Sequence, residues 1–165
     1  MTWITFTVPG EPETKRRQKL ITLPDGKGGV RAGVVSTAKV RQAEAYFASF
    51  AAAVAPSAPP ENPVMLSVEC VFGIPLRKPE WWRQAALRGA VRPRLANKDV
   101  DNLLKLVMDA MTKAGYWRND GQVVNAMVRK AYGPKAGVEV SVHYRELVQT
   151  KKEFQAWLSK QPPPR

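Results

Sequence analysis

The sequence predicts a single α+β domain, with a mixed sheet of about four strands packed on two or three helices. Its 165 residues match the usual size of one domain. Four short segments alternate apolar and polar residues with the period of a strand, and two longer segments repeat apolar residues at the spacing of a helix. The elements follow one another as strand, helix, strand, helix, strand, strand, an order that indicates one α+β layer pair.

The first third of the chain is predicted to form one strand, a loop and one helix. Residues 4–8 alternate apolar side chains with threonine, which predicts the strand. Residues 14–36 are basic and rich in glycine, with no sustained period, so we expect a long basic loop. Ser36 or Thr37 can cap a helix that runs to about Val54.

The middle of the chain carries the clearest helical pattern. A second strand is predicted over residues 64–72 and a short helix over residues 81–88. A helix then begins at Asp99 and is stopped by Gly115. Its apolar stripe comprises Leu103, Leu104, Val107, Met108 and Met111.

Two further alternating segments, residues 122–130 and 138–144, are separated by a glycine and proline turn. Segments of this kind on either side of a short turn predict an antiparallel hairpin. A last helix is expected over residues 145–160.

Positive charge is concentrated in two segments of the sequence. The chain has a formal net charge of +12, yet residues 14–41 and 76–98 together carry a net +13, so the remainder is nearly neutral. A solvated surface usually mixes both signs of charge, whereas a binding surface for phosphates does not. The distribution therefore favours a polyanionic partner, although a solvated basic surface remains the alternative.

Several other classes of protein do not fit the composition. Cys70 is the only cysteine, so no disulfide can form within the chain. The N-terminal residues lack the pattern of a signal peptide, and no apolar stretch approaches the roughly 20 residues of a membrane span. We therefore expect a cytoplasmic protein with no membrane partner. Residues 26–29 lack the spacing of a phosphate-binding P-loop, so no nucleotide cofactor is expected.

Carboxylates gather directly after the second basic segment. Asp99 and Asp101 come at the start of the predicted helix, and Asp120 follows it at the start of the next strand. Asp101, Lys105 and Asp109 are spaced four residues apart, on the helix face opposite the apolar stripe. Carboxylates from two elements that meet would form an oxygen-rich site for Mg²⁺, with Mn²⁺ as a possible substitute.

Each of these acids also has an ordinary structural explanation that the sequence leaves open. Asp99 could serve only as the N-cap of the helix. Asp101 and Lys105 could form an i, i+4 ion pair. Asp120, which precedes a glycine, could belong to a simple turn.

The segment from Lys98 to Lys130 resembles the signature of the RusA family of Holliday junction resolvases. That family has a D-x-D-N-L run, a lysine four residues after the second aspartate, a D-A-[LM] triplet, a turn of glycine and aromatic residues, an acidic pair and Q-V-V. The corresponding residues are Asp99–Leu103, Lys105, Asp109–Met111, Gly115–Trp117, Asn119–Asp120 and Gln122–Val124.

The resemblance implies a Mg²⁺-dependent endonuclease that acts as a homodimer on four-way DNA junctions. It assigns metal binding to Asp99, Asp101 and Asp120, and the role of the essential lysine to Lys105. Asn119 departs from the family, which often has a second acid at this position. The resemblance does not assign metal binding to Asp109. We expect Asp109 and Asn119 to support the site through contacts with its residues, without binding the metal.

Contacts with DNA are expected from cations of both basic segments and from a lysine at the end of a predicted strand. These residues are Lys15, Arg16, Arg17, Arg77, Lys78, Arg92, Arg94, Lys98 and Lys130. Trp81 and Trp82 would either stack on opened bases or anchor their short helix to the core.

The RusA-like domain is expected to comprise residues 1–146, with basic loops at 14–36 and 76–98. Residues 147–165 would form a C-terminal helix and a proline-rich tail. Two alternatives to a junction resolvase remain: a non-catalytic basic DNA-binding protein, and a metal-dependent nuclease with a broader specificity for branched DNA.

Overall fold

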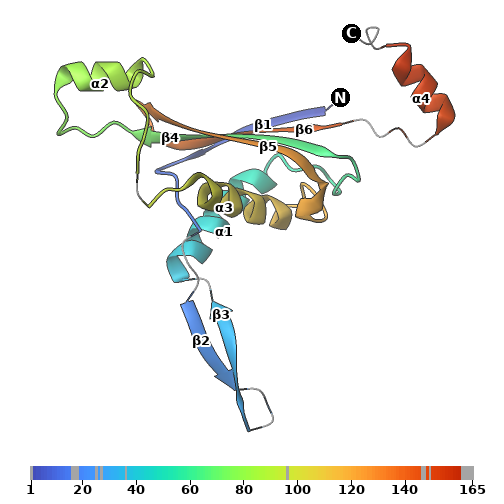
Figure 1. Cartoon of the computed structure of the whole chain (residues 1–165), viewed down its shortest axis with the longest axis horizontal. Coiled ribbons are helices and arrows are strands. Elements are labelled where there is room, and N and C mark those ends of the chain that lie inside the picture. Colours follow the sequence, from blue (N-terminus) through green and yellow to red (C-terminus); the bar gives the residue numbers. More distant parts are fainter. Residues whose placement is uncertain are drawn as a thin grey trace.

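The computed structural model describes residues 2–15, 19–24, 26, 28–35, 37–95, 97–145, 148 and 150–160. Its centre is a four-stranded mixed sheet with the strand order β1-β6-β4-β5. The strands are β1 (Thr2–Pro9), β4 (Val64–Gly73), β5 (Val123–Gly133) and β6 (Gly137–Tyr144). Helices α1 (Ala38–Ala52) and α3 (Val100–Lys113) cover one face of this sheet (Figure 1). The predicted α+β class is therefore confirmed.

The core lies between this face of the sheet and the two helices. Val64, Leu66 and Val68 of β4 are buried on the helical side, as the alternation in the sequence predicts. From α3, Leu103 and Val107 pack into the same cluster. The apolar stripe of α3 therefore fixes which face of the helix is left for polar residues.

Both helices begin and end where their sequences indicate. The Thr37 side chain accepts a hydrogen bond from the backbone N–H of Val40 and caps α1. Gly115 follows α3 with a φ of +84°, a left-handed conformation that glycine adopts at low cost. Ser36, the other predicted cap, lies outside the described residues.

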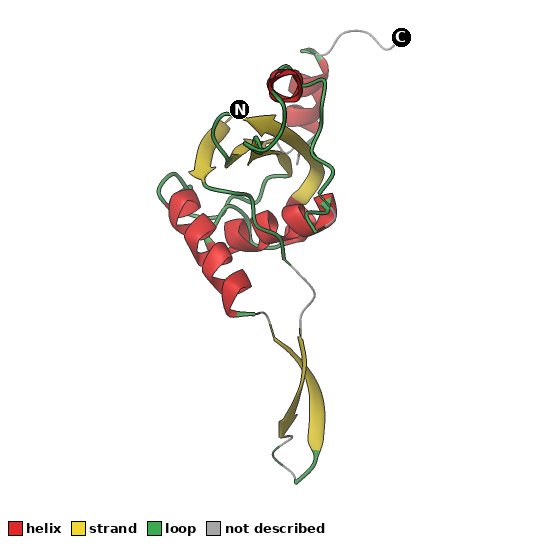
Figure 2. Cartoon of the chain, turned by 90° about the vertical axis from the view of Figure 1, so that its left-hand side faces the viewer, coloured by secondary structure: helices red, strands yellow, loops and turns green. Residues whose placement is uncertain are grey.

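The predicted loop at residues 14–36 is wrong in its main part, because the structure has a β-hairpin there. Strands β2 (Lys19–Pro24) and β3 (Val30–Val35) pair antiparallel as a separate two-stranded sheet. Figure 2 shows this hairpin as an arm that projects away from the main sheet. Neither short strand alternates regularly, because Leu20 and Ile21 are adjacent apolar residues in β2 and Gly33 lies within β3, so the sequence pattern there is weak.

The predicted hairpin of residues 122–130 and 138–144 is also wrong. Strand β5 pairs in parallel with β4, whereas β6 pairs antiparallel with both β1 and β4. The chain between β5 and β6 therefore crosses the end of β4. It passes so closely that a Cβ atom on Gly133 would lie 2.5 Å from Cγ1 of Val71. Alternation and turn residues do not distinguish this crossing from a turn between neighbouring strands.

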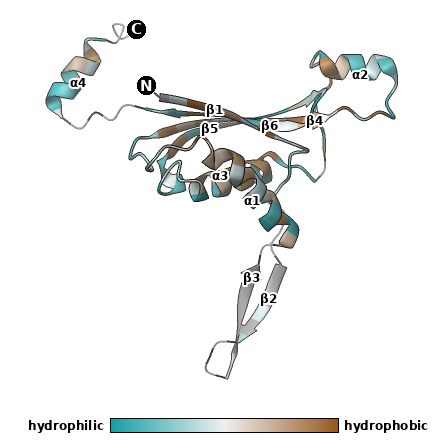
Figure 3. Cartoon of the chain, turned by 180° about the vertical axis from the view of Figure 1, so that it is seen from behind, coloured by the Kyte–Doolittle hydropathy of each residue, from teal (hydrophilic) through white to brown (hydrophobic). Residues whose placement is uncertain are grey.

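Two short helices lie at opposite ends of the sheet, α2 (Glu80–Leu87) and α4 (Lys151–Leu158) (Figure 1). Figure 3 shows that both carry hydrophobic as well as hydrophilic residues. Helix α4 begins at Lys151 and not at residue 145, because Thr150 and Glu153 form a capping box. The predicted domain boundary at residues 146 and 147 falls outside the described residues. None of the helices in the described ranges is long and apolar enough to span a membrane.

Candidate active site

Two carboxylates stand at the start of α3 and face solvent. Asp99 occupies the N-cap position in an extended conformation, but its side chain makes no capping hydrogen bond. Asp101 lies in the first helical turn, and both residues are exposed. The structure therefore gives no support to a purely capping role for Asp99. The partial positive charge of the helix N-terminus also favours anionic groups at this place.

Lys105 lies one helical turn after Asp101 and is also exposed. Within the described ranges, no ion pair joins Lys105 to Asp101 or to Asp109. The start of α3 thus presents two carboxylates and one ammonium group that form no ion pair with any side chain the structure describes. Groups in this state are available to a cation and to a phosphate.

The segment after β1 holds the start of α3 in place. The Nζ atom of Lys98 donates hydrogen bonds to the Pro12 carbonyl at 2.6 Å and to the Glu13 carboxylate at 3.0 Å. Lys130 on β5 donates to the Lys98 carbonyl at 3.1 Å. Lys98 and Lys130, predicted to contact DNA, are therefore engaged in contacts that position Asp99.

Glu13 is part of this attachment, and its contacts with lysines change its pKa. Partial burial acts to raise the pKa of Glu13, but the hydrogen bonds and charges of Lys98 and Lys39 outweigh burial. The pKa of Glu13 is therefore lowered, and its carboxylate stays charged beside the two lysines.

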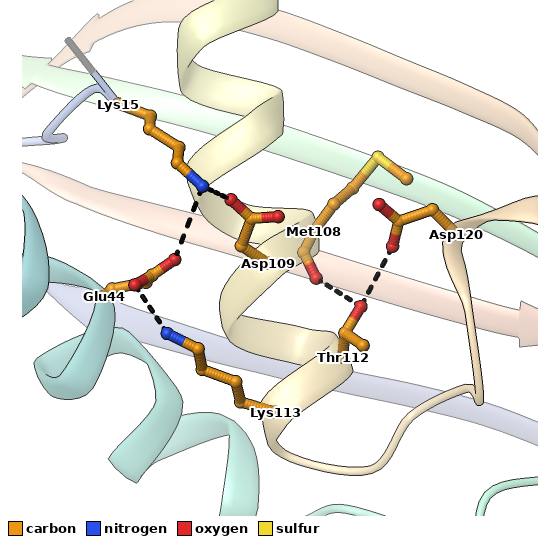
Figure 4. A network of polar contacts seen from close by, with 7 residues as sticks. All are labelled: Lys15, Glu44, Met108, Asp109, Thr112, Lys113 and Asp120. Carbon is orange, nitrogen blue, oxygen red and sulfur yellow. Dashed lines mark hydrogen bonds and ion pairs between the residues drawn. The ribbon is translucent and has the colours of Figure 1, made fainter. Parts of the chain in front are cut away.

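A second set of charged groups lies further along α3 (Figure 4). Asp109 forms an ion pair with Lys15, and Lys15 also lies 3.9 Å from the Glu44 carboxylate of α1. Glu44 is buried and forms a second ion pair with Lys113 at 2.6 Å. Asp109, which was expected to support the site, is thus bound to Lys15, and Lys15 is not free to contact DNA in this arrangement.

Asp120 lies at the far end of α3 from Asp99 and Asp101. Its carboxylate accepts hydrogen bonds from Thr112 at 2.9 Å and from the Trp117 indole at 3.2 Å. Thr112 comes eleven residues after Asp101, which corresponds to about 17 Å along a helix. One chain therefore does not bring the three predicted metal ligands together. Accordingly, the part of the chain that the structure describes contains no group of three potential metal-binding side chains.

Asn119 shapes the turn that presents Asp120. Its side-chain oxygen accepts a hydrogen bond from the backbone N–H of Gly121 at 2.9 Å and so caps the short 3-10 turn Asp120–Gln122. This role requires an acceptor and no second negative charge. Asn119 therefore supports Asp120 through the backbone.

An open cleft with a volume of about 500 Å³ surrounds Asp120. It is lined by Lys15, Glu44, Asp109, Thr112, Lys113, Arg118, Asn119 and Asp120. Thr112 was not among the predicted site residues, although it continues the polar face of Asp101, Lys105 and Asp109 and extending that face would have found it. No local pattern links Glu44 to Lys113, because they meet only through the packing of α1 on α3.

Among the cations predicted to contact DNA, those around α2 have no acidic partner in the described part of the chain. Arg77, Lys78, Arg92 and Arg94 are exposed, and no acidic side chain in the described ranges forms an ion pair with them. Arg16 and Arg17 lie outside the described residues.

Exposed carboxylates and a lysine on one helix, next to unpaired cations, define a candidate enzyme that acts on the phosphodiester backbone of a nucleic acid. The comparisons with known proteins agree with this class. Residues 9–143 match the family of the endodeoxyribonuclease RusA, so the chain belongs to that family.

Two relatives illustrate the similarity. The uncharacterized protein YqaN of Bacillus subtilis is 32% identical over 148 residues, which cover 86% of this chain and 96% of YqaN. The crossover junction endodeoxyribonuclease RusA of Escherichia coli K12 is 47% identical over 45 residues, or 27% of this chain and 38% of RusA. RusA of Enterobacteria phage 82 shows the same identity over the same length.

Proposed function

We propose that this protein is a structure-selective endonuclease that resolves four-way DNA junctions by paired, Mg²⁺-dependent hydrolysis of phosphodiester bonds. The observation that carries the proposal is the exposed, unneutralised set of Asp99, Asp101 and Lys105 at the start of α3. Membership of the RusA family supports the same activity.

Asp99 and Asp101 suit a magnesium ion. Mg²⁺ is usually held by one or two carboxylates, with water and substrate phosphates as the remaining ligands. Both carboxylates are exposed and lack ion-pair partners among the residues that the structure describes. When bound, the cation, or Mn²⁺ in its place, would lower the pKa of a ligand water and offset phosphate charge.

The residues of the chain itself would then divide the work. Asp99 and Asp101 would hold the cation at the start of α3. Lys105, one turn further along, would stabilise negative charge that develops on the phosphoryl or leaving oxygen. The contacts of Lys98 and Lys130 keep the start of α3 in place during this step.

A homodimer would complete the site. Asp120 is too far from Asp101 to share a metal with it in one chain, whereas a second copy related by a two-fold axis can place its own Asp120 beside Asp99 and Asp101. Such a dimer has two equivalent sites. Two sites suit paired cuts in a four-way junction, which has approximate two-fold symmetry.

The test is cleavage of a labelled four-way junction by Asp101→Asn, with Glu139→Gln as the control. Both variants remove one negative charge, but Glu139 is an exposed residue of β6 outside the site. We expect Asp101→Asn to lose cleavage and keep junction binding in EDTA, and Glu139→Gln to keep both. An active Asp101→Asn variant would contradict the proposal.

The same assay separates the alternatives. A non-catalytic DNA-binding protein would bind with a steep dependence on salt and cut no substrate with Mg²⁺. A nuclease of broader specificity would cut flaps and forks as readily as four-way junctions.

A further inference from the structure

Helix α2 is attached to the sheet by one of its two adjacent tryptophans. The ring of Trp82 packs edge to face on Tyr132 of β5, with a centroid distance of 5.4 Å. The Nζ atom of Lys78 lies 5.1 Å from the centre of the Trp82 ring, and Ala86 is fully buried. Trp82 therefore anchors α2, which is one of the two roles that the sequence allowed for this pair of tryptophans.

Trp81 points away from the anchor and is 70% exposed. Successive helical residues differ in direction by about 100°, so anchoring Trp82 turns Trp81 outward. In the described part of the chain, no ring or cation contacts its indole. Tryptophan is mostly buried in proteins, and it is enriched on surfaces that bind a partner.

The segment that contains Trp81, residues 76–98, has seven basic residues and one acidic residue. Gln84 and Arg88 follow it on the same helix face, and both are exposed. Glu80, the only acid between residues 76 and 98, is ion-paired with Arg83. A hydrogen bond from Gln84 and the charge of Arg83 lower the pKa of Glu80, so it remains ionised within that pair.

Helix α2 is connected to the start of α3 through strand β5. Tyr132 is two residues from Lys130 on the same face of β5, a separation of about 7 Å. Lys130 in turn contacts Lys98, the neighbour of Asp99. The same strand thus holds both the residue next to Asp99 and the helix that carries Trp81.

We infer that Trp81 stacks on an unpaired or opened DNA base beside the Asp99 and Asp101 carboxylates, and that it thereby favours branched DNA over continuous duplex. Cations alone bind phosphates of any DNA, whereas an exposed indole binds the face of a base that has left its stack. Continuous duplex offers few such faces, and a branch point offers several. This inference rests on the proposed function, because it takes branched DNA as the substrate.

The test compares the binding of a four-way junction with that of a duplex of equal length, in EDTA. We expect Trp81→Ala to weaken junction binding by between about five-fold and about 100-fold, and duplex binding by less than about two-fold. Trp81→Phe keeps an aromatic ring and should retain most of the junction affinity.

Trp3→Ala is the matched control. Trp3 is also exposed, at 64%, but it lies far from α2 along the sheet. Trp3 pairs with His143, which pairs with Met65 of β4. Met65 is seven residues along β4 from Phe72, the residue that pairs with Tyr132. This control should bind both DNAs as the wild type does. Crosslinking of 5-iodouracil at the branch point should occur with the wild type and be lost in Trp81→Ala.

An equal loss of junction and duplex binding in Trp81→Ala, or no loss, would overturn the inference. Because binding is measured without metal, a failure of the proposed function is a separate result. In that case the wild type would not cut the junction with Mg²⁺, while Trp81 would still discriminate between the two DNAs.

Discussion

Individual residues of α3 divide into two groups, one available for chemistry and one engaged in structure. Asp101 is exposed and unpaired, whereas Asp109 is ion-paired with Lys15, whose side chain is 14% exposed. The two aspartates look alike in the sequence, since both lie on the polar face of one helix. The contact with Lys15 distinguishes them.

Stability measurements should reveal this division. Asp109→Asn leaves the Lys15 charge without its main partner and is expected to lower the free energy of unfolding by about 1–3 kcal/mol. Asp101→Asn breaks no contact and should change it by less than about 0.5 kcal/mol. Urea denaturation of both variants is the check, and a larger loss for Asp101→Asn would contradict the assignment.

The lowered pKa of Glu13 predicts a dependence of stability on pH. A carboxyl group whose pKa is lower in the folded state adds stability above its ordinary pKa of 4.5, and this contribution is lost as the pH falls through the folded value. Glu13→Gln should therefore be less stable than the wild type at neutral pH, by about 0.5–1 kcal/mol. The difference should shrink below about pH 4.5 and vanish in more acidic solution. Denaturation curves across this range test the prediction, and a difference independent of pH would count against it.

Among the elements, the long helices and the buried strand could be predicted because each carries its own periodic signal. The apolar stripe of α3 and the alternation of β4 are buried as expected. The partners of β5 and β6 could not be predicted, since pairing depends on which strands meet in space. The hairpin arm of β2 and β3 was not predicted because its strands are short and neither alternates regularly.

Helix α2 offers a prediction at this scale. Trp82→Ala removes the contact with Tyr132 and should free α2 from the sheet, with faster amide hydrogen exchange in residues 80–87. Trp81→Ala removes an indole of the same size that touches no other ring and should leave exchange unchanged. Equal exchange in both variants would show that Trp82 is not the anchor.

For the whole molecule, the separation of Asp101 and Asp120 makes mixing experiments informative. Asp101→Asn and Asp120→Asn should each be inactive alone. If the site is shared between two copies, one site of a mixed dimer combines the intact Asp101 of one copy with the intact Asp120 of the other. The second site then contains both replaced residues. Mixing the two variants should therefore restore nicking of one strand of the junction.

The control for this experiment is a mixture of identical variants. Mixing two separate preparations of Asp101→Asn should restore nothing, because every dimer then lacks the same residue. If the mixture of different variants also stays inactive although subunits exchange, the sharing of Asp120 between copies is wrong.

For the candidate site too, the sequence predicts which residues take part but not which of them lie close together. The spacing predicts Asp101 and Lys105 on one face of α3 with Asp99 at its start, and the family resemblance assigns these residues their roles. The remoteness of Asp120 does not, because it depends on the length of α3 and on the turn that binds Asp120 to Thr112. Spacing along the chain thus predicts candidate residues and does not reveal which of them can meet.

The position of β6 has a consequence for how the protein is made. Strand β6 is the last of the chain, yet it lies between β1 and β4 in the sheet. Until residue 144 has left the ribosome, β1 has no strand to pair with in the main sheet. A nascent or truncated chain that ends before β6 therefore has both predicted DNA-binding segments and Asp99 but no completed sheet on which to hold them. The order of the strands therefore predicts that such a chain cannot hold Asp99 and Asp101 in their folded positions.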